Sequence, residues 1–178
     1  LAGTIRFVVG SDGSAQVLYV FSSSDGTIWK LSGQGWTSIT SPALGGFEQV
    51  VVYDDGSGPN LYVSGDQIGI QKQVGAAWVE IRPYAPNGIA YPMVVFNDGS
   101  GSRLYSLQYF ADLSGSPEEN HVRRWNGTSW SAPLGIAASL IVTAGSPPPQ
   151  LLATTTTSYP ATAVVSQWVA GVFSQLTP

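Results

Sequence analysis

Asp54-Asp55-Gly56-Ser57-Gly58-Pro59-Asn60-Leu61-Tyr62 is the stretch that decides the fold, because two other parts of the chain repeat its main residues. Asp-Gly recurs at 12–13, 55–56 and 98–99, and Leu-Tyr recurs at 18–19, 61–62 and 104–105, each time after a step of 43 residues. A constant step of about 20–50 residues indicates a repeat architecture, in which each repeat is one structural unit. Residues that recur in this way are first of all part of the scaffold.

The 178-residue chain divides into four aligned segments, approximately 3–44, 45–88, 89–135 and 136–178, which we expect to form one domain over residues 1–178. Each segment opens on a short apolar run, continues through a turn and a second run, and ends on two further runs around another tight turn. Short β-branched runs bounded by Gly, Asp or Pro predict strands. No segment shows a sustained helical period, so the prediction is an all-β fold with four antiparallel strands per segment.

Aromatic residues mark the last two strands of each segment. In the third segment we expect Val122–Trp125 and Thr128–Trp130 to pair around a turn at Asn126-Gly127. The aromatic pairs of the third and fourth segments are five residues apart, and the second segment keeps only the later aromatic, Trp78. The first segment has Trp29 and Trp36 seven apart, which predicts a turn about two residues longer. Their recurrence favours packing between repeats, with stacking on sugars as the alternative.

Four antiparallel strands with a Trp on the outer hairpin are typical of a β-propeller blade. The sequence therefore predicts a propeller of four blades, either as a complete ring or as part of a larger ring that another chain completes. The stretches 52–65 and 122–135 resemble the tandem blade repeats of secreted bacterial propellers, whose consensus reads approximately Val-Phe-Asp-Asp-Gly-Ser-Gly-Pro-x-Leu-Tyr-x-Gly-Gly and Ile-x-x-Trp-Asp-Gly-Thr-x-Trp-x-x-Leu-Gly. There is a looser similarity to Kelch-type and lectin-type propellers. The resemblance implies a secreted or cell-surface scaffold with no general catalytic motif.

Composition narrows the function further. Charged residues make up 10% of the chain and the net charge is −4, without a basic patch, so we expect no nucleic-acid partner. No window approaches the ~18–20 apolar residues of a membrane helix, so we expect no membrane insertion. Cysteine is absent, which leaves neither a disulfide framework nor a thiolate metal site. Because the chain opens with Leu1, we expect a processed mature protein or an excised piece.

The sequence contains no strong catalytic or metal-binding motif. The turn carboxylates Asp12, Asp54, Asp55 and Asp98 lack the alternating acidic spacing of calcium loops, so we interpret them as turn formers. Only Glu48 and Arg6 stand near the starts of the innermost runs, and they do not make the acid/base pair of a glycosidase. His121 is the only histidine, which favours a solvated loop residue over a base or ligand. We therefore predict no catalytic residue, no metal and no cofactor.

Residues outside the repeat are the better candidates for binding. The stretch Gln108–His121 is much longer than its counterparts, and we expect it to be a loop, where binding residues concentrate on rigid scaffolds. Packing of this loop on the blade explains its aromatics about equally well. The candidate contact residues are Tyr109, Phe110, Asp112 and His121 from this stretch, and Tyr159 from the matching polar stretch of the fourth segment.

Three functions remain open at the level of sequence. The first is a non-catalytic extracellular module that mediates protein–protein assembly, with copies of itself or with other proteins, since interface cores are poor in charge. The second is a lectin-like carbohydrate binder. The third, an enzyme or an accessory domain of one, has no acid/base pair to support it.

Overall fold

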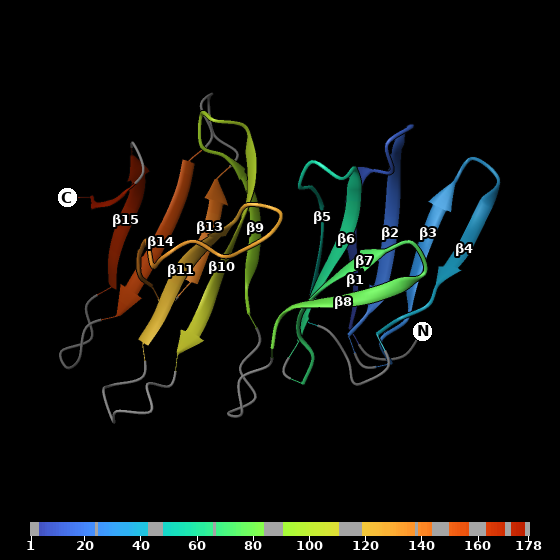
Figure 1. Cartoon of the computed structure of the whole chain (residues 1–178), viewed down its shortest axis with the longest axis horizontal. Helices are drawn as coiled ribbons and strands as arrows, with labels where there is room; N and C mark the ends of the chain where they lie inside the picture. Colours follow the sequence, from blue (N-terminus) through green and yellow to red (C-terminus); the bar gives the residue numbers. More distant parts are fainter. Residues whose placement is uncertain are drawn as a thin grey trace. The chain divides into compact units, whose positions relative to one another are not determined.

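The computed structural model describes residues 4–23, 25–42, 48–65, 67–83, 91–110, 119–137, 139–143, 150–156, 163–169 and 172–176 (Figure 1). All regular secondary structure in these ranges is β-strand, as the sequence predicts. Within the same ranges there is no helix of the length and apolarity needed to cross a lipid bilayer.

The strands form four antiparallel sheets, each of four strands hydrogen-bonded in chain order. The first sheet has β1 (Ile5–Ser11), β2 (Gln16–Ser22), β3 (Ile28–Ser32) and β4 (Gly35–Ile39), and the second has β5 (Gln49–Asp54), β6 (Pro59–Gly65), β7 (Gly69–Val74) and β8 (Ala77–Arg82). The third has β9 (Met93–Asn97), β10 (Ser102–Phe110), β11 (Glu119–Trp125) and β12 (Gly135–Ile136), and the fourth has β13 (Ser139–Thr143), β14 (Gln150–Thr156), β15 (Ala163–Val169) and β16 (Val172–Gln175). Each predicted segment thus supplies one sheet, except that Ile136 of β12 belongs to the third.

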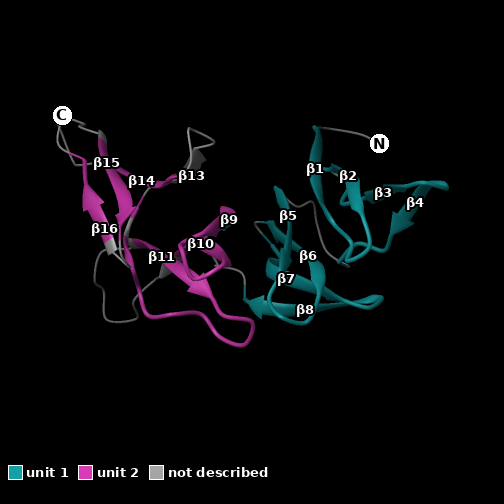
Figure 2. Ribbon diagram, turned by 90° about the horizontal axis from the view of Figure 1, so that it is seen from above, with its two compact units in different colours: residues 1–91 teal, residues 92–178 magenta. Residues whose placement is uncertain are grey.

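The sheets lie in two compact units, residues 1–91 and residues 92–178, and each unit contains two of them (Figure 2). In a strand, successive side chains point to opposite faces of the sheet. The adjacent residues of each Leu-Tyr pair therefore define two faces. We call them the leucine face, which carries Leu18 in the first sheet, and the tyrosine face, which carries Tyr19; residues paired with these across the strands share their face.

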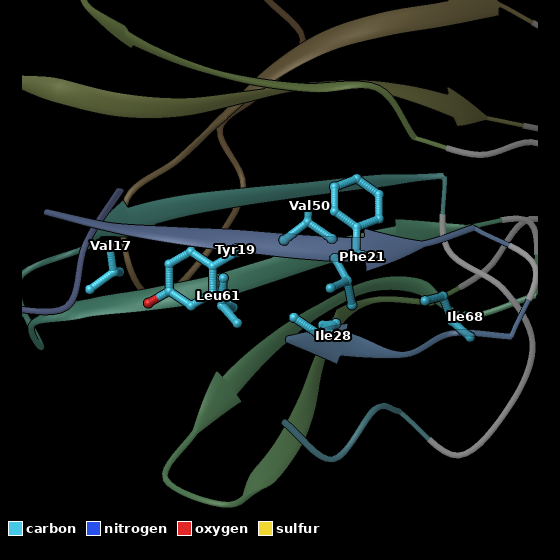
Figure 3. Close-up of a cluster of buried hydrophobic side chains, with 8 residues drawn as sticks. Val17, Tyr19, Phe21, Ile28, Val50, Leu61 and Ile68 are labelled. Carbon is cyan, nitrogen blue, oxygen red and sulfur yellow. The ribbon is translucent and has the colours of Figure 1, made fainter. Parts of the chain in front are cut away.

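In the first unit, the tyrosine face of the first sheet packs against the leucine face of the second. Side chains of β2 and β3 meet those of β5 and β6 in one buried cluster (Figure 3). Its members are Val17, Tyr19, Phe21, Ile28, Val50, Leu61, Val63 and Ile68. The chain needs this contact because a single half-apolar sheet cannot bury its own face.

The second unit repeats the same contact between the third and fourth sheets. The strand registers match five of its eight buried residues with buried residues of the first unit: Tyr105 with Tyr19, Leu107 with Phe21, Val122 with Ile28, Leu151 with Leu61, and Ala153 with Val63. Partly buried neighbours match too, Val94 with Val8 and Phe173 with Trp78. One mode of sheet-on-sheet packing therefore occurs twice in the chain.

The opening strands of paired sheets lie side by side, β1 beside β5 and β9 beside β13. Gly10 shows how close the first pair is, because a Cβ at this position would lie 2.4 Å from Cβ of Val52. No other residue fits without displacing β5. The missing side chain of Gly10 is thus a condition of the close approach.

Two details of the sequence-based strand assignment are wrong. The fourth strand of the third sheet is not Thr128–Trp130: Trp130 makes only an isolated bridge to Trp125, and the strand that pairs with β11 is β12. Between them, backbone N–H groups of Ser131 and Leu134 donate to the carbonyls of Arg124 and Val122. Four residues, 131–134, face the two residues Arg123 and Arg124. Because of these extra residues, and because Pro133 has no N–H to donate, a regular ladder cannot form there.

The outer turn of the first sheet is not longer than the others. Ser32 pairs with Gly35, as Val74 pairs with Ala77 and Val169 with Val172. The residue that faces Trp36 across the hairpin is Leu31, not Trp29. Leu31 therefore occupies the earlier aromatic position in the first sheet. The turn length predicted from the spacing of Trp29 and Trp36 is wrong because Trp29 does not stand at that position.

Candidate functional site: an open apolar sheet face

Each of the three recurrent Asp residues uses one carboxylate oxygen to form a turn and the other to bind a side chain of its own sheet. Oδ1 of Asp98 accepts hydrogen bonds from the backbone N–H and hydroxyl of Ser100, at 2.9 and 2.6 Å, which forms the turn. Oδ2 accepts from the Tyr105 hydroxyl at 2.8 Å and from Nη1 of Arg124 at 2.9 Å. Asp98 thereby links the turn to the second and third strands of its sheet.

The second sheet builds the same cluster and the first sheet a close variant. Oδ2 of Asp55 lies 2.7 Å from the Tyr62 hydroxyl and 2.5 Å from Nζ of Lys72. Oδ2 of Asp12 accepts from Nζ of Lys30 at 2.7 Å. In each case the cation stands directly opposite the tyrosine on the third strand. The fourth sheet has Leu152 and Gln167 at these two positions, so it lacks the cluster.

These contacts set the pKa values of the groups. Burial raises the pKa of the Asp98 carboxyl, but hydrogen bonds from Ser100, Tyr105 and Arg124 outweigh it and hold the pKa well below its usual range. The same balance, with Lys72, Ser57 and Tyr62 as donors, lowers the pKa of Asp55. The Lys30 hydrogen bond, followed by those from the turn, lowers the pKa of Asp12. Burial and the bond to Asp98 raise the pKa of the Tyr105 hydroxyl.

The clusters are therefore scaffold, as their recurrence predicts. The carboxylates stay ionised and their oxygens are already used by turn N–H groups, hydroxyls and cations. No three Asp, Glu, His or Cys side chains within the described ranges gather as a metal site would require. Arg6 and Glu48 are also joined structurally, since the Arg6 guanidinium donates to the backbone carbonyl of Glu48 and ties the first sheet to the second.

The leucine face of the first sheet differs from its counterpart in the second. Phe7 and Val9 on β1 are both 66% exposed, whereas Val50, which stands one repeat after Phe7, is 4% exposed against the first sheet. The cross-strand register extends this face over Leu18, Leu31 and Trp36. The leucine face of the first sheet is thus open at Phe7 and Val9, whereas Val20, which pairs with Phe7, is buried.

Trp36 makes the same contrast on the outer strand. Its counterpart Trp78 donates its indole N–H to the carbonyl of Thr40 at 2.6 Å, and so fastens the second sheet to the end of the first. In the other unit, Phe173 packs against the buried cluster that the third and fourth sheets share, and a Cβ added at Gly135 of the third sheet would lie 3.5 Å from its ring. The predicted role in packing between repeats is confirmed for both. Trp36, by contrast, is 51% exposed.

A shallow depression of about 550 Å³ lies in the first sheet, beside its β1–β2 and β3–β4 turns. Its lining mixes the polar side chains of Asp12, Ser14, Gln16 and Ser32 with the apolar side chains of Val17, Leu18 and Leu31. Leu31 is the cross-strand partner of Trp36. The open face therefore continues, at this end of the sheet, into a hollow with hydrogen-bonding groups.

Of the candidate contact residues from the sequence, the structure describes the side chain of His121 alone. The stretch Gln108–His121 is not a loop throughout, because β10 extends to Phe110 and β11 begins at Glu119, with Gln108 paired to His121. His121 is therefore a half-buried strand residue rather than a loop residue. The side chains of Tyr109 and Phe110, and all of Asp112 and Tyr159, lie outside the described residues.

Sequence reasoning missed the open face because it treated all repeated positions as scaffold and sought binding residues only outside the repeat. A usable signal was present in the alignment. Phe7 and Val9 stand at the repeat positions of Val50 and Val52, so the sequence does assign them to the same face, but it does not show whether that face is covered.

Comparisons of the chain with protein-family models, with curated proteins and with solved structures found no match. The resemblance to secreted tandem-repeat propellers stays a prediction, and the functional argument rests on the geometry above.

Proposed function

We propose that the four sheets are blades of a β-propeller and that the chain is a non-catalytic extracellular module for protein–protein assembly. The observation that carries the proposal is the repeated contact of a tyrosine face with a leucine face, with the opening strands of paired sheets closest together. A contact that is repeated by one operation generates a radial array, which is how propeller blades bury their faces. Location outside the cell rests on the resemblance to secreted propellers.

The assembly surface in this proposal is the leucine face of the first sheet, defined by Phe7, Val9, Leu18, Leu31 and Trp36. Burying a Val or Phe side chain contributes about 1.5–3 kcal/mol, so covering Phe7 and Val9 alone is a substantial driving force. Contiguous apolar surface of this kind on a protein marks an interaction site. The absence of charged side chains from these positions agrees with the composition of interface cores.

Alkylation of a single cysteine tests this role in the full chain. The natural sequence has no cysteine, so Val9→Cys introduces the only thiol. Iodoacetamide should modify Cys at position 9 more slowly as the protein concentration rises, because association covers the face. Val74→Cys, at a hairpin end where Val74 is 50% exposed, is the matched control and should react at a constant rate. Equal, concentration-independent rates at both positions would contradict the proposal.

A second candidate, carbohydrate binding, is favoured by one observation: a half-exposed Trp36 lies across the hairpin from Leu31, which lines the polar depression. Aromatic faces stack on sugar rings, while nearby hydroxyl, amide and carboxylate groups bind sugar hydroxyls. A glycan array probed with the natural chain and with Trp36→Ala separates the two functions. Sugar binding that Trp36→Ala abolishes, with an unchanged circular dichroism spectrum, supports the lectin-like function; no bound glycan excludes it.

A further inference from the structure

The fourth sheet carries apolar residues at two positions that pack against a leucine face in the first sheet. Its tyrosine face has Leu152 at the tyrosine position, with Thr154 and Val165 at the positions of Phe21 and Ile28. Leu176, which stands where Ile39 stands in the first sheet, is 43% exposed, although Ile39 packs against the core of its unit. The first sheet therefore presents a partly open leucine face, and the fourth sheet a tyrosine face of mixed polarity, on which Leu152 and Val165 lie beside Thr154 and Gln167.

We propose that a second copy of this chain covers the open face, with the tyrosine face of its fourth sheet seated on the leucine face of the first sheet. The inference rests on the proposed function and names its partner. The supporting observation is continuity with an established interface: the pairing of these two kinds of face is already made twice within the chain, once in each unit. The third such pairing, between copies, uses the same residue positions.

The existing contacts specify which residues should meet. In the second unit the rings of Tyr105 and Trp168 lie 5.5 Å apart between centroids. The register places Leu152 at the position of Tyr105 and Leu31 at the position of Trp168. Leu152 of one copy should therefore contact Leu31 of the other. Trp36, at the position of Trp78, should bury its ring against the outer strand near Leu176.

An interface between two different faces is heterologous, so each copy donates one face and accepts another. Such an arrangement closes into a ring when the rotation between copies allows it and otherwise continues as a filament. A dimer that used one face twice would instead be isologous and would place two leucine faces together. The two arrangements predict different cross-links.

Two single-cysteine chains, Leu31→Cys and Leu152→Cys, test the pairing when they are mixed and treated with a short bis-maleimide. Any link between positions 31 and 152 then joins two copies, since each chain has one thiol. We expect this mixed product to dominate over either product of like with like. The combination of Val74→Cys with Leu152→Cys is the control and should give no mixed product. Val9→Cys, on the same face as Leu31, replaces it if Leu31→Cys unfolds.

Two results would overturn the inference in different ways. A predominance of 31–31 links would show two leucine faces together, which keeps the assembly function but refutes the head-to-tail pairing. A Leu31→Cys/Leu152→Cys chain that links internally at monomer mass, without any link between single variants, would show that one chain covers its own face. That result would refute the assembly function as well.

Discussion

At the scale of single residues, the three Asp clusters show what a sequence period can and cannot reveal. Asp-Gly predicts a turn, and the turn hydrogen bonds of Asp98 and its counterparts confirm it. The second role of Asp98, as the partner of Arg124, depends on the register between β10 and β11. That register is set across a connection of variable length, so no local pattern gives it. The one sequence signal for this ion pair is that each repeat with an Asp-Gly turn and a Leu-Tyr pair also has a Lys or Arg in its third strand.

The Asp98→Asn substitution should cost about 1–3 kcal/mol of the free energy of unfolding, the usual range for losing a hydrogen bond to a charged group. Asn keeps an oxygen for the turn but no longer carries the charge opposite Arg124, and the Asp98 side chain is only 4% exposed. Urea denaturation measures the loss. Asp12→Asn is the control and should cost less, because the Asp12 side chain is 19% exposed to solvent. Equal losses in the two variants would contradict this account.

The lowered pKa values of Asp55 and Asp98 predict acid sensitivity. In the unfolded chain these carboxyls take up protons near pH ~3.9, whereas in the folded chain they stay ionised to lower pH. Stability is therefore fully present above pH ~4 and decreases as the pH falls below it. Urea midpoints measured from neutral to acidic pH should stay level and then decline, less steeply in Asp98→Asn. A midpoint that is unchanged under acidic conditions would refute the assignment.

At the scale of elements, the sequence predicts strands where apolar runs lie between turn residues, and these strands are present in all four sheets. The sequence-based prediction is wrong where the regular hydrogen-bond pairing between strands is interrupted. The stretch from Ser131 to Leu134 keeps its hydrogen bonds to β11 only by accommodating extra residues. Because Trp130 aligns with the aromatic residues of other repeats, the sequence placed the fourth strand there instead of at β12. The close approach of β1 and β5 at Gly10 is a second such feature, because a glycine in a strand does not say which neighbour it admits.

Gly10→Ala should destabilise the first unit by about 1–3 kcal/mol, the typical cost of overpacking a well-packed interior. The new methyl group would collide with Val52, so the substitution acts on the contact between sheets rather than within one. Gly33→Ala is the control, since nothing lies within 4 Å of its added Cβ. Urea denaturation of the two variants, together with Gly10→Ala/Val52→Ala, checks the cause. If removing the Val52 side chain restores no stability to Gly10→Ala, the collision is not responsible.

At the scale of the whole molecule, the alignment of four segments predicts four equivalent sheets, and the all-β, four-sheet organisation is confirmed. The propeller and its assembly function stay proposals that the twice-repeated face-to-face contact supports. The exposed face of the first sheet was not among the sequence-based candidates, because exposure is a property of packing. Phe7 and Val50 are alike in the repeat, and only the structure distinguishes the covered residue from the open one.

Sedimentation equilibrium of the natural chain and of Phe7→Lys tests the central claim most directly, because a lysine on the open face opposes its burial without touching the cores of the two units. We expect the natural chain to reach a multiple of 18.7 kDa as concentration rises, and Phe7→Lys to remain at 18.7 kDa with an unchanged circular dichroism spectrum. A natural chain that stays at 18.7 kDa throughout would contradict the claim that this face is built for assembly.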